Sequence, residues 1–244
     1  MSRSNRWDWW FGEDALPVPS VSAQAEWNEH PFDALENGKG LTLYRRDGKN
    51  RIDWRDAAPV LTTFACYEAG ELVRLWDAPY MVRQYLQAGN LGLSEQAAIA
   101  VREALDEAEL ERQTAEQLVK AAGARCPKKL GFFARAATRA AAWAAAQDHA
   151  KAMAAFHHRE AMLYAIGAAL LATVRGTPDS AWAVADAVIN AAGMLAAEEG
   201  VIVATNDSSS PNLLPPGVAQ AAGRLAATAN IRARFSAMVD QLFS

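Results

Sequence analysis

Three histidines in one alanine-rich stretch, His149, His157 and His158, are the residues whose types and spacing best suit chemistry. Successive residues of a helix turn by about 100°, so His149, His157 and Glu160 fall near one side of a continuous helix. Imidazole and carboxylate groups placed in this way could bind a transition metal or transfer a proton. His157 and His158 diverge by about 100°, so at most one of the two can reach such a site.

A metal site needs more ligands than this stretch supplies. A di-iron bundle takes a Glu-x-x-His pair from each of two helices and two further carboxylates, and a catalytic zinc takes three protein ligands. The chain has four histidines, and the fourth, His30, lies near the N-terminus. We therefore assign no metal and no cofactor, and keep a helical metalloenzyme centred on His149, His157 and Glu160 as the last alternative.

The common catalytic motifs are missing from the sequence: it has no G-x-S-x-G, no P-loop, no dinucleotide-binding glycine pattern after a strand and no H-E-x-x-H. We assign no catalytic residue and predict that the protein is not an enzyme. Cys66 and Cys126 have no metal-ligand spacing, which is typical of free thiols in a reducing compartment. We expect Cys66 to be a buried thiol and the protein to be cytoplasmic.

The sequence also predicts no membrane partner. The first residues lack the apolar core and cleavage site of a secretory signal. The most apolar run, from Ala161 to Val174, has 14 residues, which is fewer than the roughly 20 that a bilayer requires. We expect this run to be part of a buried helix.

Charge is distributed unevenly along the chain, although the net charge of −4 over 244 residues is ordinary. Residues 94–116 hold seven acids and two arginines, whereas residues 117–147 hold six bases and no acid. The basic stretch could face an anionic partner, or it could face the acidic helix and neutralise it. We favour the second interpretation, because adjacent helices of opposite charge need no outside partner.

A nucleic-acid-associated subunit is therefore the first alternative function. Such a subunit would bind phosphate groups through basic residues from the stretch at 120–139 and from the C-terminal region. These two segments would have to lie on one exposed face. The candidates are Lys128, Lys129, Arg135, Arg139, Arg224, Arg232 and Arg234.

The elements that would position these residues are mostly helical. We expect a mainly α fold: an alanine-rich multi-helix bundle with a small N-terminal β-hairpin and an irregular, tryptophan-rich N-terminal arm. Residues 1–57 would form the arm and the hairpin, with a type I′ turn at Asp47-Gly48, and residues 58–244 one compact bundle. Helices are predicted over about 94–122 and 129–175, and from a cap at Thr177-Pro178 to Glu198. After a loop at 200–217, two shorter helices would close the chain.

A rigid helical scaffold without catalytic motifs favours a non-catalytic cytoplasmic protein-binding module, such as an immunity-type inhibitor, an adaptor or a subunit of a larger assembly. The partner would be another protein, and the sequence leaves its identity and the oligomeric state open. Aromatic side chains dominate interface energetics, so the arm is one candidate contact, unless its tryptophans pack on the protein itself. The candidate contact residues are Trp7, Trp9, Trp10, Trp27, Glu103 and Glu107.

Overall fold

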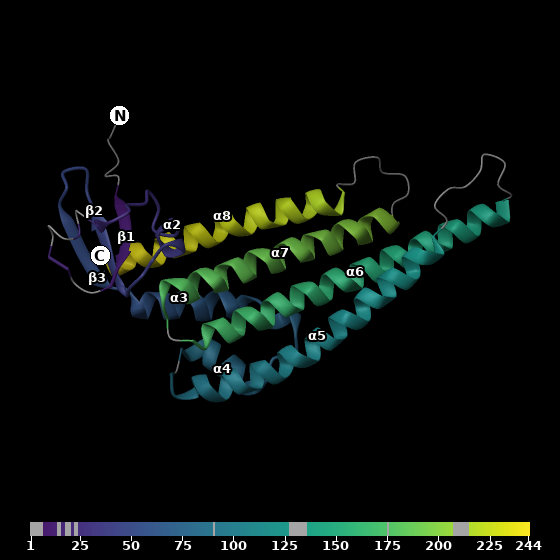
Figure 1. Ribbon diagram of the computed structural model, residues 1–244, viewed down its shortest axis with the longest axis horizontal. Coiled ribbons are helices and arrows are strands. Elements are labelled where there is room, and N and C mark those ends of the chain that lie inside the picture. Colours follow the sequence, from purple (N-terminus) through teal and green to yellow (C-terminus); the bar gives the residue numbers. More distant parts are fainter. Residues whose placement is uncertain are drawn as a thin grey trace.

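The computed structural model describes residues 7–13, 16–17, 21, 24–89, 91–126, 136–174, 176–206 and 215–244. Within these ranges the chain is mainly helical, with a three-stranded antiparallel sheet in its N-terminal part (Figure 1). The predicted fold class is confirmed. The predicted division at residue 57 coincides with the start of a helix at Ala58, but the sheet and the helices share one buried core.

The sheet has the order β1-β2-β3, formed by Asp8–Gly12, Thr42–Arg46 and Ile52–Asp56. The hairpin of β2 and β3 was predicted, but β1 comes from the arm that was expected to be irregular. Trp9 and Phe11 of β1 are buried, and the residues between and before them are half-buried. This alternation lets β1 pair with β2, so that Phe11 lies opposite Leu43 and both side chains enter the core.

The turn between β2 and β3 differs from the predicted type I′ turn. The backbone N–H of Asn50 donates to the carbonyl of Asp47 over 2.9 Å, and Asn50 is in the left-handed region with φ 59°. Gly48 does not have a positive φ. The Asp47 carboxylate accepts hydrogen bonds from the backbone N–H groups of Lys49 and Arg51, and these bonds lower its pKa. The loop is therefore a three-residue connection closed by an asparagine, the residue type that tolerates this region best after glycine.

Seven α-helices lie in the described ranges: α2 (Asp33–Glu36), α3 (Ala58–Glu71), α4 (Tyr80–Ala88), α5 (Ser94–Arg125), α6 (Ala136–Ala172), α7 (Pro178–Asn206) and α8 (Pro216–Leu242). Two short 3-10 helices, η1 (Val73–Leu75) and η2 (Leu91–Leu93), precede α4 and α5. The predicted helix at 94–122 and the cap at Thr177 are confirmed. The Thr177 hydroxyl accepts the backbone N–H of Ser180 over 3.1 Å.

Two predictions about the C-terminal third are wrong. Helix α7 does not end at Glu198 but continues through Gly200 to Asn206. A glycine costs a helix only about 1 kcal/mol, and burial of the next residue, Val201, offsets that cost. A single helix, α8, also replaces the two shorter helices that were expected. Its internal Gly223 is needed for packing, because a Cβ there would stand 2.6 Å from the Cβ of Ala196.

Helices α5, α6, α7 and α8 lie side by side in chain order, each antiparallel to the next, and α3 packs against α6, α7 and α8 (Figure 1). Helix α4 lies between α3 and α5. The sheet is at the end of the bundle where α8 ends, and α5 and α6 extend beyond α7 at the opposite end.

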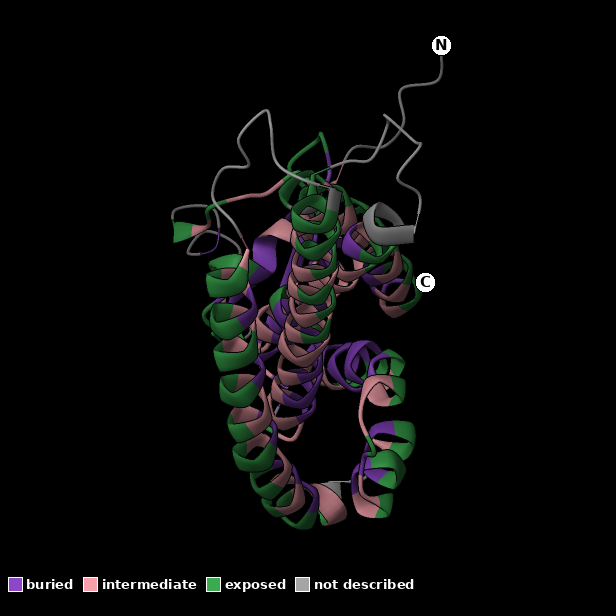
Figure 2. Ribbon diagram, turned by 90° about the vertical axis from the view of Figure 1, so that its right-hand side faces the viewer, coloured by how far each residue is buried: buried purple, intermediate pink, exposed green. Residues whose placement is uncertain are grey.

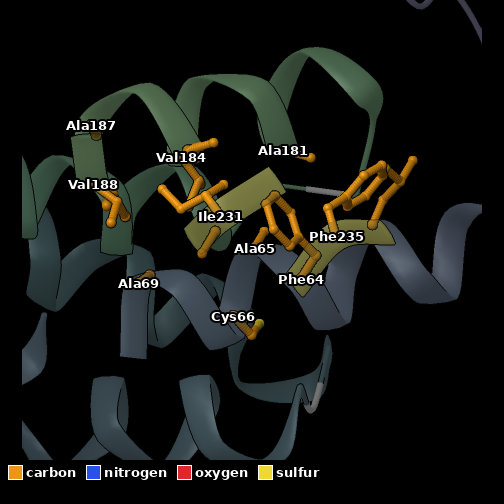
Figure 3. Packing of buried hydrophobic residues seen from close by; sticks show 14 of the residues in the cluster. Phe64, Ala65, Cys66, Ala69, Ala181, Val184, Ala187, Val188, Ile231 and Phe235 are labelled. Carbon is orange, nitrogen blue, oxygen red and sulfur yellow. The ribbon is translucent and has the colours of Figure 1, made fainter. Parts of the chain in front are cut away.

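Small side chains fill the interfaces between the long helices. Helix α6 buries a series of alanines that includes Ala161, Ala165 and Ala168, and α7 buries Ala181 and Ala185. Large side chains fill the space where three helices meet: the rings of Phe64 from α3 and Phe235 from α8 lie 4.8 Å apart beneath α7 (Figure 3). The apolar run from Ala161 thus forms the buried C-terminal part of α6, as predicted, whereas the described residues of α6 before it are not buried. Cys66 is buried with 3% exposed.

By length and composition alone, residues Pro178–Ile202 of α7 could cross a membrane. Half of the apolar stretch within this segment is buried inside the protein. No other helix in the described ranges meets the same test.

The turn geometry predicts that Asn50→Val lowers the free energy of unfolding by about 1 kcal/mol, because a β-branched residue is strained in the left-handed region. Gly48→Val is the matched control. A Cβ at Gly48 meets nothing within 4 Å, so this variant should change the stability by less than about 0.5 kcal/mol. Urea unfolding of both variants tests the assignment, and a larger loss in Gly48→Val would contradict it.

Candidate functional site

The four candidate tryptophans pack on the protein itself. Trp9 is buried with 4% exposed, and its ring lies 5.5 Å from Phe243 at the end of α8. The other three are held at the sheet: Trp10 lies 5.1 Å from the ring of Tyr44, and the guanidinium groups of Arg45 and Arg46 lie 4.4 Å from Trp7 and Trp27. These contacts anchor the arm to the fold, which leaves the acidic helix as the remaining predicted contact surface.

Helix α5 has a buried side and an exposed side. Its sequence is rich in alanine and glutamate, and Glu95 in the first turn and Arg125 in the last complement the helix dipole. Buried residues recur every seven positions at Val101, Ala108, Ala115 and Ala122, on the side that packs against α6. Figure 2 shows exposed residues along the outward side of the long helices and buried ones between them.

The outer face of α5, as we call it, consists of Ile99, Glu103, Asp106, Glu107 and Leu110. Ile99 is 51% exposed and Leu110 is 66% exposed. The three carboxylates between them are exposed, and no ion pair joins them to any other described residue. The face therefore offers two aliphatic contacts around a group of uncompensated negative charges.

Three other acids of α5 are paired with cations of α5 or α6. Arg112 lies 2.8 Å from Glu109, 3.4 Å from Glu116 and 3.3 Å from Glu160 of α6, and Arg159 of α6 lies 2.8 Å from Glu111. The Arg112 guanidinium lowers the pKa of Glu109 to about 2. These three acids are thus paired with Arg112 and Lys120 of α5 and with Arg159 of α6. Of the basic stretch at 117–147, Lys120 contributes one of these pairs.

The described basic candidates for nucleic-acid binding do not converge. Arg232 pairs with Asp33, and Arg234 pairs with Glu68 through two bonds of 2.7 and 2.6 Å. Arg224 packs its side chain against Gly193 of α7. Arg139 is near the start of α6, at the end of the molecule opposite to the C-terminal end of α8 (Figure 1). Lys128, Lys129 and Arg135 lie outside the described residues.

The histidines of α6 face different surroundings. The ring of His149 lies against Gly123 of α5, with Cε1 3.3 Å from the position of a Cβ there. His158 Nδ1 lies 3.1 Å from Glu198 of α7. Glu160 is held by Arg112. Among the described residues, no three His, Cys, Asp or Glu side chains are grouped closely enough to hold a metal, so His149, His157 and Glu160 do not form a ligand set.

His157 is the least satisfied of these side chains. Both of its ring nitrogens are buried and have no hydrogen-bond partner in the described part of the chain. Burial lowers its pKa, and the charges of Glu160 and Glu198 oppose this shift in part. The ring is therefore held in its neutral form, which suits a packed helix position.

Glu68 was not among the residues predicted from the sequence, although its carboxylate is fully buried. Glu68 continues the apolar stripe of Leu61, Phe64 and Ala65 on α3 at helical spacing. An acid on such a stripe is the signal that could have identified it, because buried charges are nearly always paired. Its partner Arg234 is 166 residues away and has no comparable signal.

No family model, curated protein or solved structure matches this chain. The functional argument therefore depends on the geometry described above.

The pair of Glu68 and Arg234 predicts unequal effects of two substitutions. Arg234→Gln leaves a fully buried carboxylate without its cation and should cost about 3 kcal/mol or more. Glu68→Gln should cost less, because the Arg234 side chain is 35% exposed and can turn to water. Urea unfolding at pH 7 measures both, and an equal or larger loss in Glu68→Gln would show that the carboxylate is not the costly partner.

The environment of His157 predicts that stability decreases in mild acid. Its folded-state pKa is below the ordinary value of 6.5, so the unfolded chain binds more protons, and the free energy of unfolding falls as the pH drops through 6.5. His157→Leu should weaken this dependence without abolishing it, because burial also lowers the pKa of His30. Urea unfolding between pH 7.5 and 5.5 tests this, and an unchanged pH dependence in the variant would contradict it.

Proposed function

We propose that the protein is a non-catalytic cytoplasmic protein-binding module whose contact surface is the outer face of α5. The observation that carries the proposal is the combination of exposed Ile99 and Leu110 with the unpaired carboxylates of Glu103, Asp106 and Glu107. The partner that this face fits is a protein with a basic surface that also presents apolar side chains. An immunity-type inhibitor, an adaptor or an assembly subunit would all use such a face.

The two kinds of side chain would do different work in a complex. Burial of the exposed aliphatic groups contributes affinity, at about 25 cal/mol for each Å² removed from water. The carboxylates would raise the association rate and disfavour acidic partners, because complementary charge steers encounter and like charge opposes it. Their charge is available to a partner because no described cation is paired with it.

The backbone of this face is held in place before any partner binds. The inner side of α5 packs on α6 through Val101 and Ala108, and Arg112 links the two helices through Glu160. A preorganised surface loses less conformational entropy on binding than a flexible one. This rigidity favours binding over a role as a simple spacer.

The nucleic-acid alternative has less support. It required the two basic segments to meet on one face, whereas Arg232 and Arg234 are engaged with Asp33 and Glu68 at the end of the bundle away from Arg139. The outer face of α5 would itself repel phosphates.

Site-specific photo-crosslinking in the native cell tests the proposed surface. A benzophenone amino acid at Leu110 should yield one discrete protein adduct, whereas the same group at Leu225 of α8, which is 74% exposed, should not. Glu103→Lys combined with Glu107→Lys should reduce the Leu110 adduct about tenfold, because charge complementarity is reversed.

Asp77→Lys combined with Asp240→Lys is the matched control, because it makes the same change in net charge at exposed positions away from α5. This variant should retain the Leu110 adduct. Equal adducts at Leu110 and Leu225, or an adduct that survives reversal of Glu103 and Glu107, would refute the proposed surface.

A further inference from the structure

A cavity of about 460 Å³ lies between α3 and α4, apart from the outer face of α5. Its inner wall is apolar: Cys66 is 3% exposed and Leu86 is 6% exposed, and Val73 of η1 adds a further aliphatic group. Cavities that bind small molecules fall in this range of volume and are lined mainly by apolar groups with a few polar ones. The size and the lining therefore suit a small organic ligand rather than a folded partner.

The rim of the cavity carries an aromatic ring and two opposite charges that do not pair with each other. Tyr67 is 45% exposed, and Glu71 and Arg83 are both exposed at the rim. The charge of Glu71 acts on Arg234, whose guanidinium lies 5.7 Å from the Tyr67 ring. Arg83 has no ion-pair partner among the described residues. Its guanidinium is therefore available at the rim to pair with an anion, although Glu71 adds a negative charge at the same entrance.

Gly70 keeps this space open without serving the fold. It lies in the last turn of α3 and lines the cavity, and a Cβ there would meet nothing within 4 Å. Its φ is not positive, so the backbone does not require a glycine. Alanine, which fills many helix positions of this chain, would favour the helix more. The position is thus neither sterically nor conformationally restricted to glycine, and its effect is to leave the cavity unfilled.

We propose that this cavity binds a small amphipathic anion, a molecule with a flat apolar body and one carboxylate. The body would pack on Cys66, Val73, Leu86 and the Tyr67 ring. The carboxylate would accept hydrogen bonds from the guanidinium of Arg83, whose planar donor group matches carboxylate geometry.

Binding of 2-naphthoate to the full chain, followed by ligand-observed NMR and titration calorimetry, tests this proposal. A ligand of this size in a formed pocket should bind with a dissociation constant of about 1 mM or tighter. The neutral analogue 2-naphthylmethanol should bind about tenfold more weakly, because it forms no charge-assisted bond with Arg83. Absence of saturable binding, or equal affinity for the two compounds, overturns the proposal.

Three variants locate the binding site. Gly70→Leu should fill the cavity and weaken naphthoate binding at least about tenfold, without lowering the melting temperature, because the change also favours the helix. Gly217→Leu on α8 is the matched control, since its Cβ also meets nothing within 4 Å, and it should leave binding unchanged. Arg83→Gln should remove the preference for naphthoate over the alcohol. Unchanged binding in Gly70→Leu, or an equal loss in Gly217→Leu, would place the ligand elsewhere and refute the site.

Discussion

The close contact between α6 and α7 is the constraint on which the rest of the structure depends. Both helices bury alanines. The buried alanines of α6 include Ala161, Ala165, Ala168, Ala169 and Ala172, and those of α7 include Ala181, Ala185 and Ala191. Methyl side chains let two helix backbones approach closely, but each one buries little apolar area. Stability must therefore come from long helices that repeat the contact many times. This is consistent with the addition of α5 and α8 on either side as further long helices, and with the position of the large residues Phe64 and Phe235 where α3 packs against the layer.

A polar contact determines how α8 joins this layer. The buried carboxylate of Glu68 on α3 requires a cation, and Arg234 supplies it from α8 with both oxygens of the carboxylate satisfied. Apolar contacts of Ile231, Phe235 and Val239 would tolerate some sliding of one helix along the other, whereas a two-bond ion pair would not. The same placement brings Phe243 at the end of α8 to Trp9 of the sheet. The N-terminal strand and the C-terminal helix are thus held in one arrangement by residues from opposite ends of the chain.

What could be predicted from the sequence follows from the range of each interaction. Local signals were sufficient for two elements: the apolar periodicity of residues 94–122 predicted α5, and the Thr177-Pro178 cap predicted the start of α7. Contacts between distant parts of the sequence could not be predicted. Nothing near Asp33 indicates a partner 199 residues away, and nothing near Glu68 indicates one 166 residues away. The same limit applies to β1, whose partner strand lies more than thirty residues further along the chain. Arg232 and Arg234 were for this reason counted among the candidates for phosphate binding, and the sequence left open whether the arm tryptophans pack on the protein itself. For the candidate site, the sequence supplied Glu103 and Glu107 but not their lack of partners, which depends on where Arg112 and Arg159 point.

The two sides of α5 differ in how their charges are compensated. On the inner side, Arg112 is paired with carboxylates of both α5 and α6, so the negative charge there is compensated in part. On the outer side, no described cation lies within ion-pair distance of Glu103 or Asp106, and like charges on neighbouring turns repel each other by a few tenths of a kcal/mol. A helix that served only the fold would gain stability by placing lysines among them. The stability of the fold therefore does not explain the outer carboxylates. In the proposed complex, cations of a basic partner would offset this repulsion, and its relief would contribute to the affinity.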